Sequence, residues 1–168
     1  MTLHELTIAF EEFDSATELP EDEQKLILSA WEARRYAYSP YSHFQVGAAV
    51  STNKVGRIFL GSNQENANFK VSCAERVVLD SMGAIGLKHL VNKIAIVGGP
   101  DSMNPYHEAI GLEEPVTPCG QCRQDIKEVE DIAGQPTVII MASRNRVRRI
   151  VGIKNLLPFA FGPADLGK

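Results

Sequence analysis

The sequence predicts an α/β fold, in which helices pack on the faces of a mixed sheet of about five strands. Segments of helical periodicity alternate with short apolar runs along the chain, which is the first indication of this class. The second is the order of these segments, which runs helix, hairpin, helix, strand, helix, strand, strand, and both cysteine motifs fall at the start of a predicted helix. At 168 residues the chain has the length of one domain. We therefore expect a single domain over residues 1–168.

The first half of the chain predicts helices separated by a hairpin. Residues 2–14 fit either a short helix or an arm that lies on a neighbouring molecule. Pro20 and three following acidic residues open a helix, because proline suits the first turn and acids favour the positive end of the helix dipole. The elements that follow are a strand at 44–50, a turn at 53–56, a strand at 57–60, a loop at 61–67 and a helix at 72–87.

The second half predicts strands and one further helix. Residues 93–97 are a short, nearly continuous apolar run closed by two glycines and a proline, which indicates a strand. The basic run at 144–149 alternates with apolar residues, which favours the solvent face of a strand over an arm that binds phosphate. The other elements are a polar loop at 101–116, a helix at 119–129 and strands at 137–141 and 149–153.

Composition and charge exclude several classes of function. The formal net charge of −4 argues against a dedicated nucleic-acid binder. The N-terminus lacks the basic and apolar pattern of a signal peptide, and no apolar run approaches the roughly 20 residues that cross a bilayer. Three cysteines, two of them in a CxxC motif, favour a metal site in a reducing compartment. We expect a cytoplasmic protein without nucleic-acid or membrane partners.

The three cysteines are the candidate metal ligands. Cys73 begins the motif Cys-Ala-Glu, and Cys119 and Cys122 lie in the motif Pro-Cys-Gly-Gln-Cys. A structural zinc site is closed by four protein ligands, whereas a catalytic site keeps three and leaves the fourth position to water. None of the four histidines lies at ligand spacing from a cysteine. The pattern therefore favours a catalytic zinc site over a structural one or a disulfide between Cys119 and Cys122.

Charged residues beside the cysteines are candidates for supporting the zinc ion. Three thiolates on zinc(II) leave a net negative charge that opposes ionisation of a bound water, so the protein must compensate. Two helix N-termini, each equivalent to roughly half a positive charge, supply part of this. Arg76 lies one helical turn after Cys73 and is the first candidate donor to the thiolates, with Arg123 second. Glu75 fits a proton carrier, although by itself it would equally fit a first-turn acid that favours its helix.

Five blocks of sequence carry a resemblance to a known family. They are Ser39–Ala49, Gly61–Ala67, Cys73–Arg76, Pro118–Gln124 and Leu156–Leu166. In this order they resemble the cytidine deaminase family, specifically its small homotetrameric branch, over about residues 25–166. The resemblance implies a three-layer α/β/α sandwich with a mixed five-stranded sheet, one zinc ion per subunit and a homotetramer with shared active sites. It also implies hydrolytic deamination of cytidine and deoxycytidine to uridine and deoxyuridine in pyrimidine salvage, with release of ammonia.

The resemblance assigns roles to residues that the sequence alone would explain differently. Asn63 and Glu65 match the residues that hold the ribose hydroxyl, although by themselves they would be turn residues. An amide and a carboxylate suit vicinal hydroxyls, because together they offer donors and acceptors. Phe44 matches the aromatic residue that lies against the pyrimidine, and Phe161 matches one that a neighbouring subunit supplies. Each phenylalanine by itself would more simply be a core residue.

The remaining implied roles surround the base and the zinc ion. The backbone around Ala74 and Thr117 is expected to contact the base and its amino group. Arg76 matches the arginine that hydrogen-bonds the zinc thiolates, in agreement with the charge argument. Glu75 is expected to protonate N3 of the pyrimidine and then the departing amine.

Three segments depart from the family pattern. The stretch 68–72 is slightly shorter than in typical members, the loop at about 101–117 is enlarged, and an N-terminal extension runs to about residue 19. We expect the loop to be a surface insertion or a subunit contact. The shorter stretch borders the base pocket and leaves a second hypothesis, a deaminase of a modified cytosine nucleoside such as blasticidin S. A third is a non-catalytic, zinc-stabilised nucleoside-binding protein, against which the intact Glu75 argues.

Overall fold

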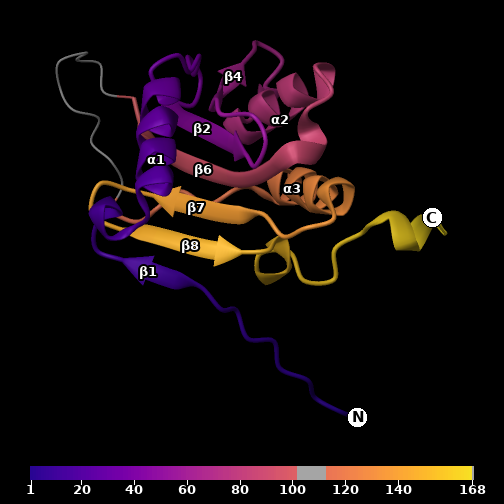
Figure 1. Ribbon diagram of the computed structural model, residues 1–168. Coiled ribbons are helices and arrows are strands. Elements are labelled where there is room, and N and C mark those ends of the chain that lie inside the picture. The colour runs from indigo at the N-terminus through magenta and orange to yellow at the C-terminus, as the bar shows by residue number, and fades with distance from the viewer. Residues whose placement is uncertain (102–112, 168) are drawn as a thin grey trace.

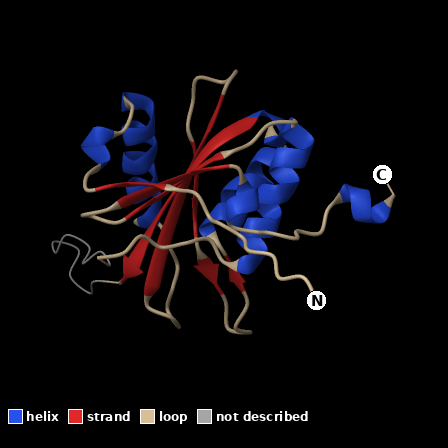
Figure 2. Cartoon of the chain, turned by 90° about the horizontal axis from the view of Figure 1, so that it is seen from below, coloured by secondary structure: helices blue, strands red, loops and turns tan. Residues whose placement is uncertain are grey.

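The computed structural model describes residues 1–101 and 113–167, and it has a mixed sheet between two layers of helices (Figure 1, Figure 2). The strands of this sheet are β1 (Glu11–Phe13), β2 (Phe44–Thr52), β3 (Phe59–Ser62), β6 (Val91–Pro100), β7 (Val138–Ala142) and β8 (Val147–Val151). The helices are α1 (Glu21–Arg34), α2 (Ala74–Ala84) and α3 (Gly120–Ala133). Two short strands, β4 (Gln64–Glu65) and β5 (Val71–Ser72), pair with each other. Short 3-10 turns occupy Ala16–Glu18, Lys88–Leu90, Ile153–Asn155 and Pro163–Leu166.

The order of strands confirms the predicted three-layer sandwich, with one strand more than expected. The sheet runs β1-β8-β7-β6-β2-β3. The pair β6–β7 is parallel, and the other pairs of this sheet are antiparallel. Helix α1 packs on one face, and helices α2 and α3 pack on the other (Figure 2). The sixth strand is β1, which comes from the N-terminal extension.

The central strands are buried on both faces, because neighbouring residues of a strand point to opposite sides. Ile94 and Ile96 pack against α2 and α3, whereas Ala95 and Val97 face α1. All four side chains are fully buried. This double burial explains why the sequence of β6 is a nearly continuous apolar run.

Two glycines let helices approach the sheet closely. A Cβ atom at Gly47 would lie 2.0 Å from the carbonyl oxygen of Ala30 in α1. A Cβ atom at Gly61 would lie 2.4 Å from the carbonyl oxygen of Ala74, the first residue of α2. Such contacts are far inside van der Waals distance, so only glycine fits at these positions. Gly61 therefore sets the position of the helix end that follows Cys73.

The N-terminal segment forms a short strand in place of the helix that was one expectation for residues 2–14, and the other expectation, an arm on a neighbouring molecule, stays a prediction for residues 1–10. Glu11–Phe13 form a strand that pairs antiparallel with β8, and Glu11 lies opposite Arg149. Opposite charges on facing residues stabilise such a pair. Residues 1–10 belong to no helix or strand and are exposed, and Figure 1 shows that they extend away from the sheet.

The other elements lie near their predicted positions. Strand β6 is longer than predicted, because β2 pairs with it along its length, from Phe44 opposite Pro100 onward. The basic run lies on the β7–β8 turn and on β8, where arginines 146, 148 and 149 form ion pairs with glutamates. Most of the enlarged loop, residues 102–112, lies outside the described residues. In the part of the chain that the structure describes, no helix is long and apolar enough to cross a membrane.

Candidate metal centre

Three cysteine sulfurs converge where α2 and α3 begin. Cys73 precedes the first residue of α2, Cys119 precedes the first residue of α3, and Cys122 lies in the first turn of α3. The Sγ atoms of Cys73 and Cys119 are 3.8 Å apart, those of Cys119 and Cys122 are 3.5 Å apart, and all three lie within 4.8 Å of one another. Tetrahedral zinc with Zn–S bonds of 2.3 Å places its sulfurs about 3.8 Å apart. The cluster therefore fits one zinc ion.

Both helix starts favour negative charge on the sulfurs. The backbone of Cys73 and of Cys119 is extended, and neither cysteine makes a side-chain cap hydrogen bond to its helix. The first turns then present unpaired N–H groups and the positive ends of two helix dipoles to the cluster. This environment stabilises thiolates. A bound metal ion then has to balance only part of their negative charge.

The sulfurs are too close for all three to ionise without a cation. A hydrogen bond with Cys122 lowers the pKa of Cys73 to about 6, and a hydrogen bond with Cys119 and the charge of Arg76 act in the same direction. The pKa of Cys122 is raised, because this thiol hydrogen-bonds to Cys73 and is buried. One thiolate thus suppresses ionisation of its neighbour. Metal binding requires thiolates, so a cation must replace the shared protons.

Nothing else in the described residues completes a four-ligand set. The cluster contains three cysteines and no histidine or carboxylate within the same distance, and all three cysteines are free. His107 lies outside the described residues. Three protein ligands are the set that catalytic zinc sites use, whereas structural sites use four. Cys119 is exposed while Cys122 is buried, so the cluster is accessible from one side.

Glu75 lies beside the cluster in the first turn of α2. Its side chain is almost fully buried, and burial raises its pKa to about 7. Its own backbone N–H lowers the pKa, the charge of Cys73 raises it, and a hydrogen bond with the Cys122 thiol lowers it again. Glu75 is not a member of the ligand cluster. A buried carboxyl group that exchanges its proton near neutral pH is suited to general acid–base chemistry.

Arg76 connects the two helices that carry the cysteines. Its Nε donates to Oδ2 of Asp125 in α3 at 3.3 Å, and both side chains are mostly buried. Its charge also contributes to the low pKa of Cys73. This contact supports the sequence-based placement of a positive charge near the thiolates. The predicted hydrogen bond from Arg76 to a sulfur stays a prediction.

Arg123 makes its hydrogen bonds to backbone carbonyl groups. Its Nε donates to the carbonyl of Pro118 at 2.9 Å, and its Nη1 donates to the carbonyl of Leu156 at 2.9 Å. Arg123 therefore holds the chain just before Cys119 and the start of the C-terminal segment. These contacts give Arg123 a part in shaping the loop around the thiolates, and its role as the second candidate donor to them stays a prediction.

Asn63 joins the ends of two strands next to Phe44. Its Nδ2 donates to the carbonyl of Phe44 at 2.9 Å, and its Oδ1 accepts from the N–H of Val46 at 2.8 Å. Asn63 is buried, and Phe44 is partly buried at the start of β2. The side-chain amide therefore fixes the backbone that carries the predicted base-stacking residue.

Glu65 is held by the turn that precedes β2. Its Oε2 accepts the N–H groups of Tyr41 at 2.9 Å and Ser42 at 3.2 Å. The side chain of Ser42 makes the largest contribution to lowering the pKa of Glu65, and these N–H groups add to it. Glu65 is thus kept ionised at the edge of a cavity of about 270 Å³. The cavity is lined by Tyr41, Ser42, Glu65, Asn66, Phe69, Lys70 and Val71.

The remaining predicted site residues are Ala74, Thr117 and Phe161. The first two are close to a cysteine in the sequence, and the third lies in the C-terminal segment. Ala74 is buried at the start of α2, directly after Cys73, and Thr117 is exposed two residues before Cys119. Phe161 is 57% exposed, and its carbonyl accepts a hydrogen bond from Gln124 of α3 at 2.8 Å. It belongs to the C-terminal segment, which extends away from the sheet in Figure 1.

Sequence reasoning missed two residues that shape the centre. Asp125 pairs with Arg76, and Gly61 allows the close approach of α2. Asp125 had a usable signal, because it lies three residues after Cys122 just as Arg76 lies three residues after Cys73. Opposite charges one turn beyond the ligands on two adjacent helices favour a salt bridge. Gly61 had no comparable signal, since a close approach is a property of the packed structure.

The sequence of this chain is similar to one family model and to several known proteins. The family model for the cytidine and deoxycytidylate deaminase zinc-binding region matches residues 20–140. A cytidine deaminase of Halalkalibacterium halodurans is 35% identical over 146 residues, which cover 86% of this chain and 98% of that protein. A cytidine deaminase of Sporosarcina psychrophila is 34% identical over 146 residues, with 86% and 95% covered.

Solved structures give the same result. The cytidine deaminase from Burkholderia pseudomallei superposes with a TM-score of 0.67 at 34% identity, and the match covers 85% of this chain and 100% of that one. The cytidine deaminase from Mycobacterium tuberculosis superposes with a TM-score of 0.60 at 29% identity, covering 85% and 99%. The similarity thus extends over nearly the whole of each relative and leaves a part of this chain unmatched.

Proposed function

This chain belongs to the cytidine and deoxycytidylate deaminase zinc-binding family, and from that premise we propose how its own residues deaminate cytidine and deoxycytidine. The protein is a zinc-dependent cytidine deaminase, a hydrolase of pyrimidine salvage that releases ammonia. The observation that carries the residue assignments is the position of buried Glu75 beside three sulfurs at zinc-binding distances. The products are uridine and deoxyuridine.

Cys73, Cys119 and Cys122 would hold the zinc ion. When bound, zinc lowers the pKa of a coordinated water from 15.7 towards about 7 and so makes it a nucleophile at neutral pH. Three thiolates oppose this effect, because they add negative charge. The two helix N-termini offset part of that charge. Arg76, held in place by Asp125, offsets a further part.

Glu75 moves the protons. Its carboxylate takes a proton from the water that adds to C4 of the pyrimidine and delivers this proton to N3. It then takes the second proton of that water and delivers it to the amino group, which leaves as ammonia. A pKa near 7 allows one carboxyl group both to accept and to donate at neutral pH. Burial of the side chain makes the largest contribution to this pKa.

Asn63 and Glu65 bind the sugar in this scheme. An amide has two N–H donors and two acceptor lone pairs, so one of each remains after the bonds of Asn63 to Phe44 and Val46. The carboxylate of Glu65, kept ionised by the Tyr41–Ser42 turn, accepts from a ribose hydroxyl. The ring of Phe44 then lies against the base.

Backbone groups at both cysteine motifs complete the recognition of the base. Ala74 directly follows Cys73 and Thr117 lies two residues before Cys119, which supports a role for their N–H and carbonyl groups in contacting the amino group. A carbonyl acceptor there distinguishes the amino group of cytidine from the carbonyl oxygen of uridine. The product therefore loses an interaction that the substrate makes.

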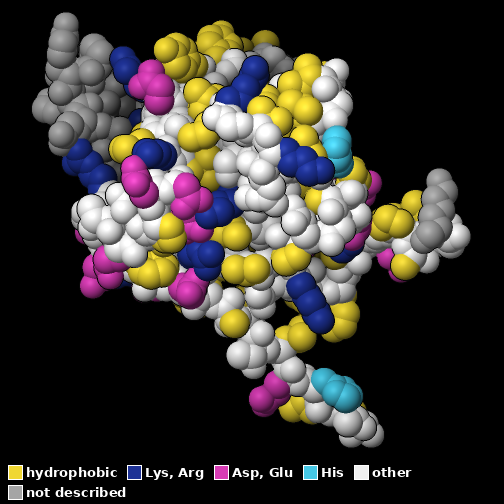
Figure 3. Space-filling model, in the orientation of Figure 1, with side chains coloured by type: hydrophobic (Ala, Val, Ile, Leu, Met, Phe, Trp, Pro, Cys, Tyr) yellow, Lys and Arg dark blue, Asp and Glu magenta, His cyan; other side chains and the backbone are white. Residues whose placement is uncertain are grey.

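We also propose a cytoplasmic homotetramer in which Phe161 completes the site of a neighbouring subunit. Phe161 is 57% exposed and Phe159 is 93% exposed, on a segment that projects from the body of the molecule. Figure 3 shows hydrophobic side chains on both projecting terminal segments. Free thiols at the metal centre fit a reducing compartment. We also propose that residues 1–168 form one domain, and the pairing of β1 with β8 in the main sheet supports this.

A modified cytosine nucleoside such as blasticidin S is the second candidate substrate. The cavity beside Glu65 has a volume of about 270 Å³ and is lined by residues of the shortened 68–72 stretch. It offers room next to the sugar for a larger group. A non-catalytic binding protein is disfavoured, because its fold would have no need of a buried carboxyl group at Glu75.

The test is a spectrophotometric screen of the purified protein with cytidine, deoxycytidine, cytosine, blasticidin S and adenosine. We expect turnover of both nucleosides and far slower turnover of cytosine, which lacks the sugar that Asn63 and Glu65 bind. Turnover of blasticidin S alone would replace the proposed substrate. Absence of turnover with zinc fully loaded would contradict the catalytic assignment.

A further inference from the structure

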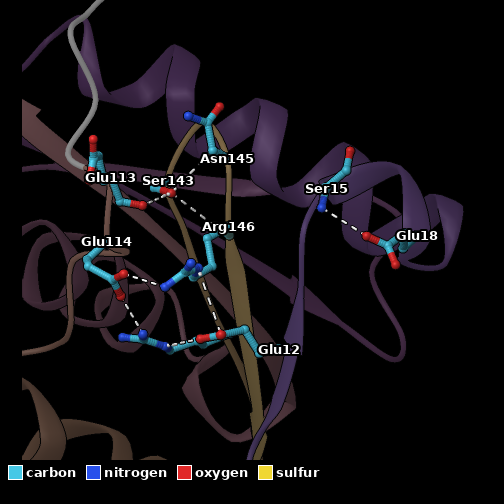
Figure 4. Close-up of polar contacts among 9 residues, drawn as sticks. Glu12, Ser15, Glu18, Glu113, Glu114, Ser143, Asn145 and Arg146 are labelled. Atoms are coloured by element: carbon cyan, nitrogen blue, oxygen red, sulfur yellow. Dashed lines mark hydrogen bonds and ion pairs between the residues drawn. The ribbon is translucent and has the colours of Figure 1, made fainter.

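Two glutamates and two arginines form a closed ring of ion pairs at the edge of the sheet, most of which Figure 4 shows. Glu12 lies on β1 and Glu114 lies a few residues before Cys119. Nε of Arg148 is 2.7 Å from Oε2 of Glu12, and its Nη2 pairs with Glu114. Nη1 of Arg146 pairs with Glu114, and its Nε is 3.8 Å from Oε1 of Glu12. Each carboxylate faces both guanidinium groups. The two negative and two positive charges sum to zero.

The charge ring joins three parts of the chain that are distant in sequence. They are the N-terminal extension, the β7–β8 hairpin and residues 113–118, the segment that leads to Cys119. A second contact holds the same segment, because Oγ of Ser143 in the hairpin turn donates to the carbonyl of Glu113 at 2.9 Å (Figure 4). The start of the 113–118 segment is thus fixed to the hairpin and, through Glu12, to β1.

The 113–118 segment, which leads to the metal centre, has a restrained backbone. Pro115 and Pro118 are both buried, and a proline ring fixes φ near −65°. The side chain of Val116 packs close to β6, so that a Cβ atom at Gly98 would lie 3.0 Å from its Cγ2. Thr117 lies between Val116 and Pro118, two residues before Cys119. Few backbone torsions between Glu114 and Thr117 are therefore free to change, so a displacement of Glu114 also moves Thr117.

We propose that Glu12 is a positioning residue, through which the N-terminal strand sets the 113–118 segment in the place that nucleoside binding requires. This inference rests on the proposed function, because it takes Thr117 as a contact of the base. The family model begins at residue 20, and the Halalkalibacterium halodurans enzyme is 98% covered while this chain is 86% covered. The strand and its glutamate therefore lie outside the region that the family model describes.

The neighbouring glutamate on β1 has a different set of partners. Nη1 of Arg149 is 2.6 Å from Oε2 of Glu11, and Nε of Arg149 is 3.0 Å from Oε2 of Glu23 in α1. Glu23 is fully buried and also pairs with Lys93 of β6 at 2.8 Å. This network stays with α1 and the sheet. Glu11 thus has the same charge and the same strand as Glu12 but no described ion pair to the 113–118 segment, which makes it a matched control.

The expected effect of breaking the ring is modest and specific. In the Glu12→Gln variant, Arg146 and Arg148 would share Glu114 alone, and the charges would no longer balance. The side chains of the ring are 27–53% exposed, so solvent screens each pair. An exposed network of this size supports a change of about threefold in KM for cytidine. The value of kcat should stay within about twofold, because the sulfurs and Glu75 keep their places.

The experiment compares Glu12→Gln, Glu114→Gln, the double variant and Glu11→Gln in the zinc-loaded enzyme. We expect the first two to raise KM about threefold and the double variant to add nothing further, since they break one network. Hydrogen exchange of the peptide 113–119 should accelerate in these three variants. Glu11→Gln should lower the melting temperature while KM and this exchange stay at wild-type values.

Two results would overturn the proposal. One is an unchanged KM and unchanged exchange at 113–119 in Glu12→Gln. The other is an equal effect of Glu11→Gln on KM and exchange, which would reduce β1 to a general stabiliser. A wild-type enzyme without cytidine turnover would instead defeat the proposed function, and the exchange comparison would still test whether Glu12 holds the segment.

Discussion

The sulfur cluster and the charge ring bring ionisable groups together in opposite ways. In the ring, each glutamate faces two arginines, and the side chains stay partly exposed. In the cluster, three thiols converge beside Glu75; Cys122 and Glu75 are buried, and burial raises the pKa of Glu75 to about 7. A ring that neutralises itself contributes to structure. A buried group of acids without enough positive charge needs a cation, and this need identifies the site of chemistry.

Replacing the buried acid should give the largest effect. Glu75→Gln keeps the size of the side chain but removes its ability to carry a proton, so kcat should fall by about 10³-fold. Zinc content and melting temperature should stay near wild-type values, because Glu75 is not in the ligand cluster. Ammonia release and elemental analysis measure the two properties.

Asp80→Asn is the control, since Asp80 is an exposed acid on the same helix. It should leave turnover unchanged. Undiminished ammonia release by Glu75→Gln would contradict the distinction between the cluster and the ring, because Glu75 would then take no part in the reaction.

The buried carboxyl group should also destabilise the metal-free protein at high pH, which the ring should not do. The folded-state pKa of Glu75 is about 7 against 4.5 for an ordinary glutamate, so folding favours its protonated form. The stability that this preference contributes is present below pH 4.5 and is lost as pH rises through 7. Glu75→Gln should therefore stabilise the metal-free protein by about 3 kcal/mol at pH 8 and hardly at all at pH 4.

Urea unfolding of chelator-treated protein at both pH values checks this. Glu12→Gln, in the ring, should stabilise the protein at neither pH. Equal stability of wild type and Glu75→Gln at pH 8 would mean that Glu75 is solvated and that the cluster is not a strained site.

The position of α2 makes the cluster possible, and Gly61→Ala should disturb it. The new Cβ atom would lie 2.4 Å from the carbonyl of Ala74 and 2.8 Å from the N–H nitrogen of Val78. The helix must shift, which we expect to cost about 2 kcal/mol of unfolding free energy and to weaken zinc binding. Gly56→Ala is the matched control, because a Cβ atom there meets nothing within 4 Å. Equal stability of the two variants would show that α2 is not held by this contact.

Phe161 extends the comparison to a neighbouring subunit and should give the smallest of these effects. Phe161→Ala should raise KM for cytidine roughly fivefold, since the substrate would lose an aromatic contact. Light scattering should show a weaker tetramer. Leu166→Ala, which removes another exposed apolar side chain of the same segment, should leave KM unchanged. A monomeric and fully active Phe161→Ala variant would remove the shared site.

The same contrast explains what the sequence allowed us to predict. The cluster follows from local patterns, because Cys73, Glu75, Cys119 and Cys122 lie at fixed offsets from two helix starts. The family resemblance supplied Asn63 and Glu65, which local patterns would leave as turn residues. The helices and most strands follow from periodicity.

The charge ring could not be predicted in this way. Strand β1 has three residues and pairs with β8, more than 130 residues later, which offers arginines opposite its glutamates. Neither hydrophobic periodicity nor strand propensity indicates a pairing between residues so far apart in the sequence. The partners of Arg123 and the approach at Gly61 depend equally on packing that only the folded chain defines.

X-ray absorption at the zinc edge, combined with elemental analysis of the native protein, tests the central claim most directly. The account predicts one zinc per chain, with three sulfur neighbours at about 2.3 Å and one oxygen neighbour near 2.0 Å. Four protein ligands around the metal, or a native protein free of zinc, would contradict it.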